Sequence, residues 1–197
     1  MTQDDQTIEV YNAQTLDYAK MVQSDVPNPQ LDAFLAQLPA GGDVLDLGCG
    51  PGHAAARMCD NGFAVTATDA SPEMAAMARA QFGLTIRVAS FADLRDDAAF
   101  DGVWASFSLL HAPKSDIPGH LAAIHRALRP GGLLCIGLKT GEGEARDRLG
   151  RFYAYYSDAE ITGLLGTAGF TVTARATGAG KGLEGTIAPW IVLIAHG

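Results

Sequence analysis

One stretch of the chain constrains its fold most, because a short apolar run leads directly into a turn crowded with glycine. Val44–Leu47 has the length and apolar character of a buried strand, Gly48–Gly52 supplies the turn, and His53–Asp60 has a helical pattern. Glycine lets the backbone take positive φ angles and approach a ligand closely. The start of the following helix offers free N–H groups and a positive dipole end. The stretch therefore predicts a strand–turn–helix unit whose turn contacts a ligand.

Beyond this turn, short apolar runs alternate with helical patterns, which is typical of a parallel sheet flanked by helices. The tail departs from that pattern, because the strands Phe170–Thr177 and Trp190–Ala195 have only the loop Gly178–Gly185 and a few residues between them. A connection this short cannot make a parallel crossover, so these two strands are expected to form an antiparallel hairpin. The parallel strands are expected at Val44–Leu47, Ala64–Thr68, Ile86–Ala89, Gly102–Ser106 and Leu133–Leu138.

Composition narrows the class of protein further. The 197 residues, 48% of them hydrophobic, favour one globular domain. A net charge of −8 without a basic cluster argues against a nucleic-acid partner, and no apolar run is long enough to span a bilayer. Three widely spaced cysteines and an acidic, polar start predict a cytoplasmic protein. The histidines lack metal-ligand spacing, so no metal site is expected, and the oligomeric state is not indicated.

An acidic residue stands where a dinucleotide-type fold would need one. Asp69 ends the second expected strand, about 20 residues after Gly48, where doubly wound folds place a carboxylate on a ribose diol. The alternative is that Asp69 caps the helix that opens at Ser71-Pro72. Because Ser71 already supplies a capping side chain, the ribose interpretation is favoured.

At this point the sequence resembles the class I S-adenosylmethionine-dependent methyltransferases. Four motifs occur in that family's order, namely Asp46–Gly52, Thr68–Met74, Phe100–Trp104 and Leu128–Gly132. The resemblance covers about residues 42–140, and the terminal hairpin matches the rest of the family's fold. It implies a single domain with a Rossmann-like, seven-stranded α/β fold, mostly parallel, with a C-terminal antiparallel hairpin. Its expected parts are an N-terminal helical cap (1–40), a cofactor-binding core (41–140), an acceptor lid (141–156) and a helix with the terminal hairpin (157–197).

The resemblance also assigns roles in binding S-adenosylmethionine and its product S-adenosylhomocysteine. It places the glycine turn on the methionine and ribose part, Asp69 on both ribose hydroxyls, and the end of the fourth strand beneath the sulfonium. Ser90 stands where the family often has an acidic residue that bonds the adenine amine, so the Phe91 N–H is the remaining donor there. The expected cofactor-binding residues are Tyr11, Asp46, Gly48, Cys49, Gly50, Gly52, Asp69, Ala70, Met74, Ser90, Phe91, Ala105, Ser106 and Phe107.

The acceptor side has fewer signals. His111 is a candidate general base because its ordinary pKa suits neutral pH, although it could equally be a histidine bonded to the backbone. The run Lys139–Tyr156 is long, charged and rich in tyrosine, which suits a lid, and a solvated face is the alternative. Tyr11 and Tyr18 either close over the cofactor or merely pack there. The expected acceptor-binding residues are Tyr18, Lys139, Glu142, Arg146 and Tyr153.

Methyl transfer to a small-molecule acceptor, without a metal ion, is the function that the resemblance implies. A protein that only senses S-adenosylmethionine stays open as an alternative. A nicotinamide oxidoreductase is disfavoured because its G-x-G-x-x-G motif would need glycine at His53. A phosphate loop at Gly178–Gly182 is also disfavoured, since Lys181 is followed by glycine rather than Ser or Thr. The methylated atom is not indicated.

Overall fold

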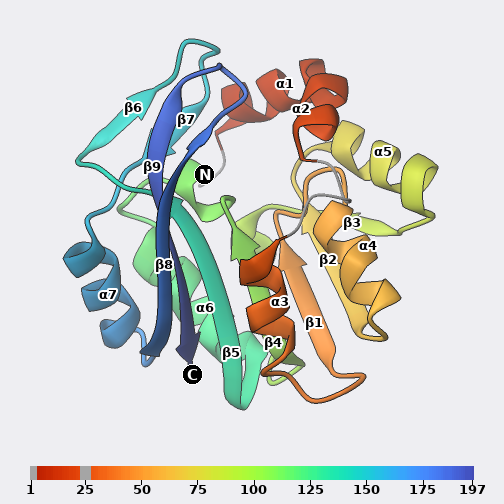
Figure 1. Cartoon of the computed structure of the whole chain (residues 1–197), viewed down its shortest axis with the longest axis vertical. Helices are drawn as coiled ribbons and strands as arrows, with labels where there is room; N and C mark the ends of the chain where they lie inside the picture. Colours follow the sequence, from red (N-terminus) through yellow and green to blue (C-terminus); the bar gives the residue numbers. More distant parts are fainter. Residues whose placement is uncertain (1–3, 23–27) are drawn as a thin grey trace.

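A computed structural model describes residues 4–22 and 28–197 (Figure 1). Parts of the predicted helical cap, residues 1–3 and 23–27, lie outside the described residues. The chain forms a seven-stranded sheet in the order β3-β2-β1-β4-β5-β9-β8, with β1 to β5 parallel and β9 antiparallel to both of its neighbours. The strands are β1 (Asp43–Leu47), β2 (Ala64–Asp69), β3 (Ile86–Val88), β4 (Phe100–Ser106), β5 (Leu128–Lys139), β8 (Thr171–Lys181) and β9 (Ile187–His196).

Helices cover both faces of this sheet, as the alternation of strands and helices predicts. Successive strand residues point to opposite faces, so Leu45 and Leu47 join one buried cluster with α6 and α7, while Val44 joins another with α3 and α4. Small side chains, Ala55, Ala67 and Ala78, let α4 and α5 pack closely on β2. The helices are α3 (Pro29–Leu35), α4 (His53–Asp60), α5 (Pro72–Phe82), α6 (Ile117–Ala127) and α7 (Asp158–Thr167).

The terminal hairpin is longer than the sequence predicts. Gly178 and Lys181 were expected in a flexible loop, but β8 runs through both and pairs with β9 as far as Lys181 and Ile187. The glycine has a packing role, because a side chain on Gly178 would collide with the indole ring of Trp190, its partner across the ladder. Glycine disfavours a strand because it has no side chain to pack. Here a large ring from the neighbouring strand fills that space, so the strand continues through the glycine.

Two segments close the carboxyl ends of the parallel strands (Figure 1). One is the N-terminal pair of helices, α1 (Asp5–Ala13) and α2 (Thr15–Met21), which meet at Gln14. The other is a small antiparallel sheet, β6 (Glu144–Arg146) and β7 (Phe152–Ala154), within the predicted lid. From here on, the helical cap means α1 and α2 alone, and the other segment is called the β6–β7 hairpin. Among the described residues, no helix is both long and apolar enough to cross a membrane.

Candidate functional site

Three adjoining cavities lie beneath the helical cap, at the carboxyl ends of the parallel strands. We name them after one residue of each, the Asp69 cavity (about 100 Å³), the Asp46 cavity (about 400 Å³) and the Lys139 cavity (about 230 Å³). Tyr18 and Phe107 line all three of them. The cavities are therefore compartments of one cleft, divided by these two rings, at the edge where open α/β sheets bind ligands.

The glycine turn forms one wall of this cleft, and its glycines have different reasons to be there. A side chain on Gly48 would collide with Ser108, and one on Gly52 would meet Ala78 at 2.9 Å. Gly50, at φ +54°, would meet only Tyr18, at 3.3 Å, and it lines two of the cavities. Packing within the protein thus explains Gly48 and Gly52, whereas Gly50 leaves backbone exposed to the cleft.

Asp69 joins the glycine turn to the start of α5. Its Oδ2 accepts a hydrogen bond from the Gly50 N–H at 2.8 Å, and its Oδ1 accepts one from the Ser71 N–H at 2.8 Å. Ser71 itself caps α5 through a bond from the Met74 N–H. Burial raises the pKa of Asp69, while the backbone bonds oppose that shift. The carboxylate therefore lies in the Asp69 cavity, held by two turns, without serving as the helix cap.

Asp46 is a buried carboxyl group that the folded chain leaves incompletely bonded. Asp46 lies just before the glycine turn and lines the cavity named after it. Its Oδ2 has no hydrogen-bond partner among the described residues. Burial, together with the nearby Asp69 carboxylate, raises the pKa of Asp46 to about 8. An orphaned buried oxygen is costly, so this position suits a ligand that brings a hydrogen-bond donor or a positive charge.

The lining of the Asp69 cavity is mostly apolar, which suits an aromatic ring. Ala70, Met74, Ser90 and Phe91 all line it, which brings these four predicted residues together. The Ser90 hydroxyl and N–H both donate to Asp93, so Ser90 shapes the local turn.

Phe107 holds an unusual backbone conformation at the centre of the cleft. It follows β4 at φ +56°, a region that non-glycine residues seldom occupy, and its N–H donates to the Gly137 carbonyl. Such strain costs on the order of 1–3 kcal/mol and tends to occur at functional sites. Its exposed ring faces Trp190 in an edge-to-face contact with centroids 6.4 Å apart.

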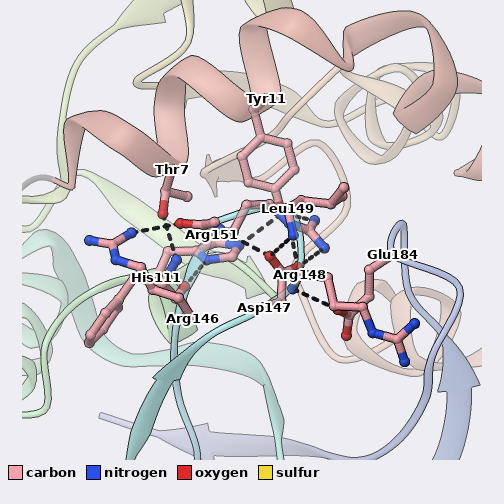
Figure 2. Close-up of polar contacts among 11 residues, drawn as sticks. Thr7, Tyr11, His111, Arg146, Asp147, Arg148, Leu149, Arg151 and Glu184 are labelled. Carbon is pink, nitrogen blue, oxygen red and sulfur yellow. Dashed lines mark hydrogen bonds and ion pairs between the residues drawn. The ribbon is translucent and has the colours of Figure 1, made fainter.

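A directed chain of hydrogen bonds connects the β6–β7 hairpin to His111 (Figure 2). Asp147 accepts from the buried Arg151 guanidinium at 2.6 Å, Arg151 donates to the Tyr11 oxygen at 3.0 Å, and that oxygen lies 2.8 Å from His111 Nε2. His111 Nδ1 lies 2.6 Å from the Phe152 carbonyl, which can only accept, so Nδ1 carries the proton and Tyr11 donates to Nε2. Burial, together with the charges of Arg151 and Lys139, lowers the pKa of His111 to about 4, although the bond to the Phe152 carbonyl opposes the shift.

The helical cap is fastened to the same hairpin at two further points. The Phe152 N–H donates to the Thr7 hydroxyl at 2.8 Å, and Arg146 forms an ion pair with Asp4 at 2.7 Å. Asp4 and Thr7 line the Asp69 cavity. The hairpin therefore holds the cap in place over the cleft.

Most of the predicted site residues come together, and four do not. Ala105 is fully buried behind the cleft, and Gly52 packs on α5. Glu142 and Arg146 were expected to bind the acceptor, but both are exposed, and neither lines these cavities, since Arg146 is used by Asp4. The predicted residues that do line the cleft are Tyr11, Tyr18, Asp46, Gly48, Cys49, Gly50, Asp69, Ala70, Met74, Ser90, Phe91, Ser106, Phe107, His111, Lys139 and Tyr153.

Among the residues of the Lys139 cavity that sequence reasoning missed are Arg151, Lys181 and Trp190. Arg151 follows Asp147 at a spacing that indicates pairing in a helix, but this segment is not helical. The sequence offered one signal for Trp190, namely a large aromatic residue in one strand of the terminal hairpin facing a glycine in the other.

Comparison with known proteins agrees with the order of the motifs. Residues 44–132 match the family model described as a methyltransferase domain. A malonyl-[acyl-carrier protein] O-methyltransferase of Enterobacter lignolyticus is 38% identical over 109 residues, which is 52% of this chain and 42% of that protein. A ubiquinone biosynthesis O-methyltransferase of Xanthomonas oryzae pv. oryzae is 38% identical over 116 residues, 54% of this chain and 48% of that protein. The matches thus span less than half the length of these relatives.

A solved structure extends the similarity to nearly the whole fold. It is a Burkholderia thailandensis 1,6-didemethyltoxoflavin-N1-methyltransferase with 1,6-didemethyltoxoflavin and S-adenosylhomocysteine bound. The TM-score is 0.80 at 24% identity, over 98% of this chain and 87% of that one. The predicted Rossmann-like methyltransferase fold is confirmed. By family match, residues 44–132 form a methyltransferase domain, and in motif order and architecture the whole chain resembles the class I S-adenosylmethionine-dependent methyltransferases.

Proposed function

We propose that this protein binds S-adenosylmethionine and transfers its methyl group to a small-molecule acceptor. The observation that carries the proposal is the divided cleft, in which Tyr18 and Phe107 lie between two compartments next to the glycine turn and a third beside Lys139. Such a layout provides for one ligand along the turn and a second ligand that meets it at the dividing rings.

The residues of the first two compartments fit the cofactor. Gly50 has no side chain between its backbone and the cleft, so a ligand can approach that backbone beside Tyr18. The carboxylate of Asp69 faces the cavity whose other walls suit an adenine ring. The orphaned Asp46 oxygen suits the positive charge or N–H donors of the methionine part. We therefore assign adenosine to the Asp69 cavity and the methionine part to the Asp46 cavity.

When bound, S-adenosylmethionine supplies an electrophilic methyl group, so the protein has to position an acceptor and exclude water. The aromatic rings of Tyr11, Tyr18 and Phe107 exclude water at the place where the compartments meet. His111 receives a narrower role here than that of a general base. Both of its ring nitrogens are already bonded, and its lowered pKa makes it a weak base. We propose that His111 holds Tyr11, and through it the cap, in position.

A paired binding and turnover measurement tests the proposal. Titration calorimetry with S-adenosylhomocysteine and with NADH separates a methyltransferase from a nicotinamide enzyme. A screen of small amines, thiols, phenols and carboxylates for methylated products then separates catalysis from sensing. Binding of NADH in preference to S-adenosylhomocysteine would refute the cofactor assignment. Tight S-adenosylhomocysteine binding without turnover of any acceptor would favour the sensor.

A further inference from the structure

The Lys139 cavity is positively charged in a chain whose net charge is −8. Lys139, Arg151 and Lys181 line it, and no Asp or Glu is present among the described residues that do so. The charge that lines the cavity is therefore opposite in sign to the net charge of the protein. Lysines that serve only solubility would not need to gather in one cavity.

The three cations are not equivalent. Arg151 is compensated, since its guanidinium is paired with the equally buried Asp147 at 2.6 Å. Lys139 and Lys181 form no ion pair within residues 4–22 and 28–197. The Lys139 ammonium lies 3.9 Å from the centroid of the Tyr153 ring, which orients it without neutralising it. Glu184 and Asp147 act on Lys139 at longer range without forming an ion pair with it, so both ammonium groups can still pair with a ligand.

Both lysines stand at the ends of strands, and Lys181, next to the hairpin turn, is exposed. Lys139 ends β5 and pairs with Trp190 of β9, and Lys181 ends β8 and pairs with Ile187 of the same strand. The Trp190 ring lies against Gly178 of β8. The two ammonium groups are thus borne by strands on either side of one tryptophan.

Aromatic rings form much of the remaining lining of this cavity, beside the aliphatic side chains of Met21, Val22, Leu110, Leu183 and Ala188. Tyr11 and Tyr18 meet edge to face at 5.2 Å, and Tyr153 lies against His111 with ring centroids 4.6 Å apart. Trp190 and Phe107 form another edge-to-face pair, with ring centroids 6.4 Å apart. Aromatic side chains prefer offset or edge-on contact with another ring, so these walls favour a flat, aromatic ligand over a flexible aliphatic one.

We propose that the acceptor is a planar aromatic anion, such as a ring that bears a carboxylate. Its acidic group pairs with Lys139 and Lys181, and its nucleophilic atom lies towards Tyr18 and Phe107, where the three compartments meet. A lone pair of that atom forms the new bond to the methyl carbon, the carbon–sulfur bond breaks with its electron pair left on sulfur, and the proton of the nucleophile passes to water. This inference rests on the proposed methyltransferase function.

Binding of matched acids and amides tests this substrate class without turnover. Protein saturated with S-adenosylhomocysteine, and protein without it, are titrated calorimetrically with 1-hydroxy-2-naphthoate and with its neutral amide. The smaller pair salicylate and salicylamide follows. Because a charge-assisted hydrogen bond is the stronger kind, the wild-type protein should bind each acid at least tenfold more tightly than its amide.

Variants assign the preference to the two lysines. Lys139→Met and Lys181→Met keep the aliphatic stem and should each reduce the acid-to-amide ratio at least threefold, whereas Lys139→Arg should retain it. Lys20→Met is the matched control, since Lys20 is an exposed lysine that lines none of the three cavities. Circular dichroism confirms the fold of each variant.

Each outcome decides one claim. Equal binding of acid and amide, or no millimolar binding of either acid, overturns the substrate class. An acid preference that survives both methionine variants overturns the assignment to these lysines. Failure of the wild-type protein to bind S-adenosylhomocysteine overturns the proposed function instead, and the titrations without it still report on the cavity.

Discussion

Tyr11 donates a hydrogen bond to His111 Nε2 at 2.8 Å, because the other ring nitrogen is committed to the Phe152 carbonyl. The tyrosine comes from the helical cap, the histidine follows β4, and the carbonyl belongs to the β6–β7 hairpin. One imidazole ring therefore joins the three segments that enclose the cleft. This relationship separates a positioning histidine from a catalytic base in the experiments that follow.

The first prediction concerns turnover. His111→Gln keeps hydrogen-bonding groups at both ends of a similar side chain, so a positioning role predicts a fall in kcat of less than about tenfold. Removing a general base would lower kcat by about 10²–10⁴-fold. The pH profile of kcat is the second readout, and it should keep its shape in the variant. A loss of the larger size that eases at high pH would restore His111 as the base.

The second prediction is a pH dependence of stability. His111 is neutral in the folded state, with a pKa of about 4, against 6.5 when unfolded. Below pH 6.5 the unfolded chain binds a proton that the folded chain does not, so stability falls as the pH drops from 6.5 towards 4. At pH 5 the loss is about 2 kcal/mol. Urea unfolding of wild type and His111→Gln at pH 7.5 and 5.0 should show this extra loss in wild type alone, and equal losses would contradict it.

The third prediction isolates the contact of Gly50 with a ligand. Gly50→Ala should weaken S-adenosylhomocysteine binding at least tenfold, because the new methyl group enters the cleft beside Tyr18. Gly62→Ala is the matched control, since Gly62 also has a positive φ (+85°) but has nothing within 4 Å of the added carbon. Both variants should lose about 1 kcal/mol of stability from backbone strain. Equal affinities in calorimetry would make the turn purely structural.

The fourth prediction concerns Asp69. Asp69→Asn removes the negative charge while nearly preserving shape, so S-adenosylhomocysteine affinity should fall by about 1.5–3 kcal/mol. The glycine turn should loosen as well, because Asp69 accepts bonds from Gly50 and Ser71. Adenine alone serves as the control ligand in calorimetry, and its affinity should change less. Unchanged S-adenosylhomocysteine affinity in the folded variant would refute the ribose assignment.

The fifth prediction concerns the buried ion pair of Asp147 and Arg151, whose side chains are each 2% exposed. Asp147→Asn leaves a buried cation uncompensated and should cost about 3–5 kcal/mol of unfolding free energy. The double variant Asp147→Asn with Arg151→Met removes that cation and should recover part of the loss. Denaturant unfolding of the single and double variants measures the coupling, and additive effects would show that the pair is independent.

The sequence predicts the parts of the molecule that depend on local pattern. The strand–turn–helix unit around Gly48–Gly52 is predictable because glycine positions and apolar periodicity act within a few residues. The mostly parallel sheet with its terminal antiparallel hairpin follows from alternation and from the impossibility of a short parallel crossover. Residues that line the cleft from that unit, such as Asp46, Gly50 and Asp69, are predictable for the same reason.

Long-range packing is what the sequence hides. Arg146 and Arg151 are both arginines of one charged run, yet one pairs with Asp4 at the surface and the other is buried against Asp147. Nothing local distinguishes them, because their environment is set by a helix more than a hundred residues away. The length of β8 was underestimated for a similar reason, since Trp190 of the neighbouring strand compensates for Gly178.

The fastening of the helical cap has a consequence for how the molecule is made. The cap leaves the ribosome about 140 residues before its partners Arg146, Arg151 and Phe152. Contacts so distant along the chain form slowly, because a large loop must close before they contribute. The nascent chain can therefore assemble β1, β2 and the glycine turn before the helical cap has docked. The cleft is covered last, although the helices that cover it are synthesised before the sheet.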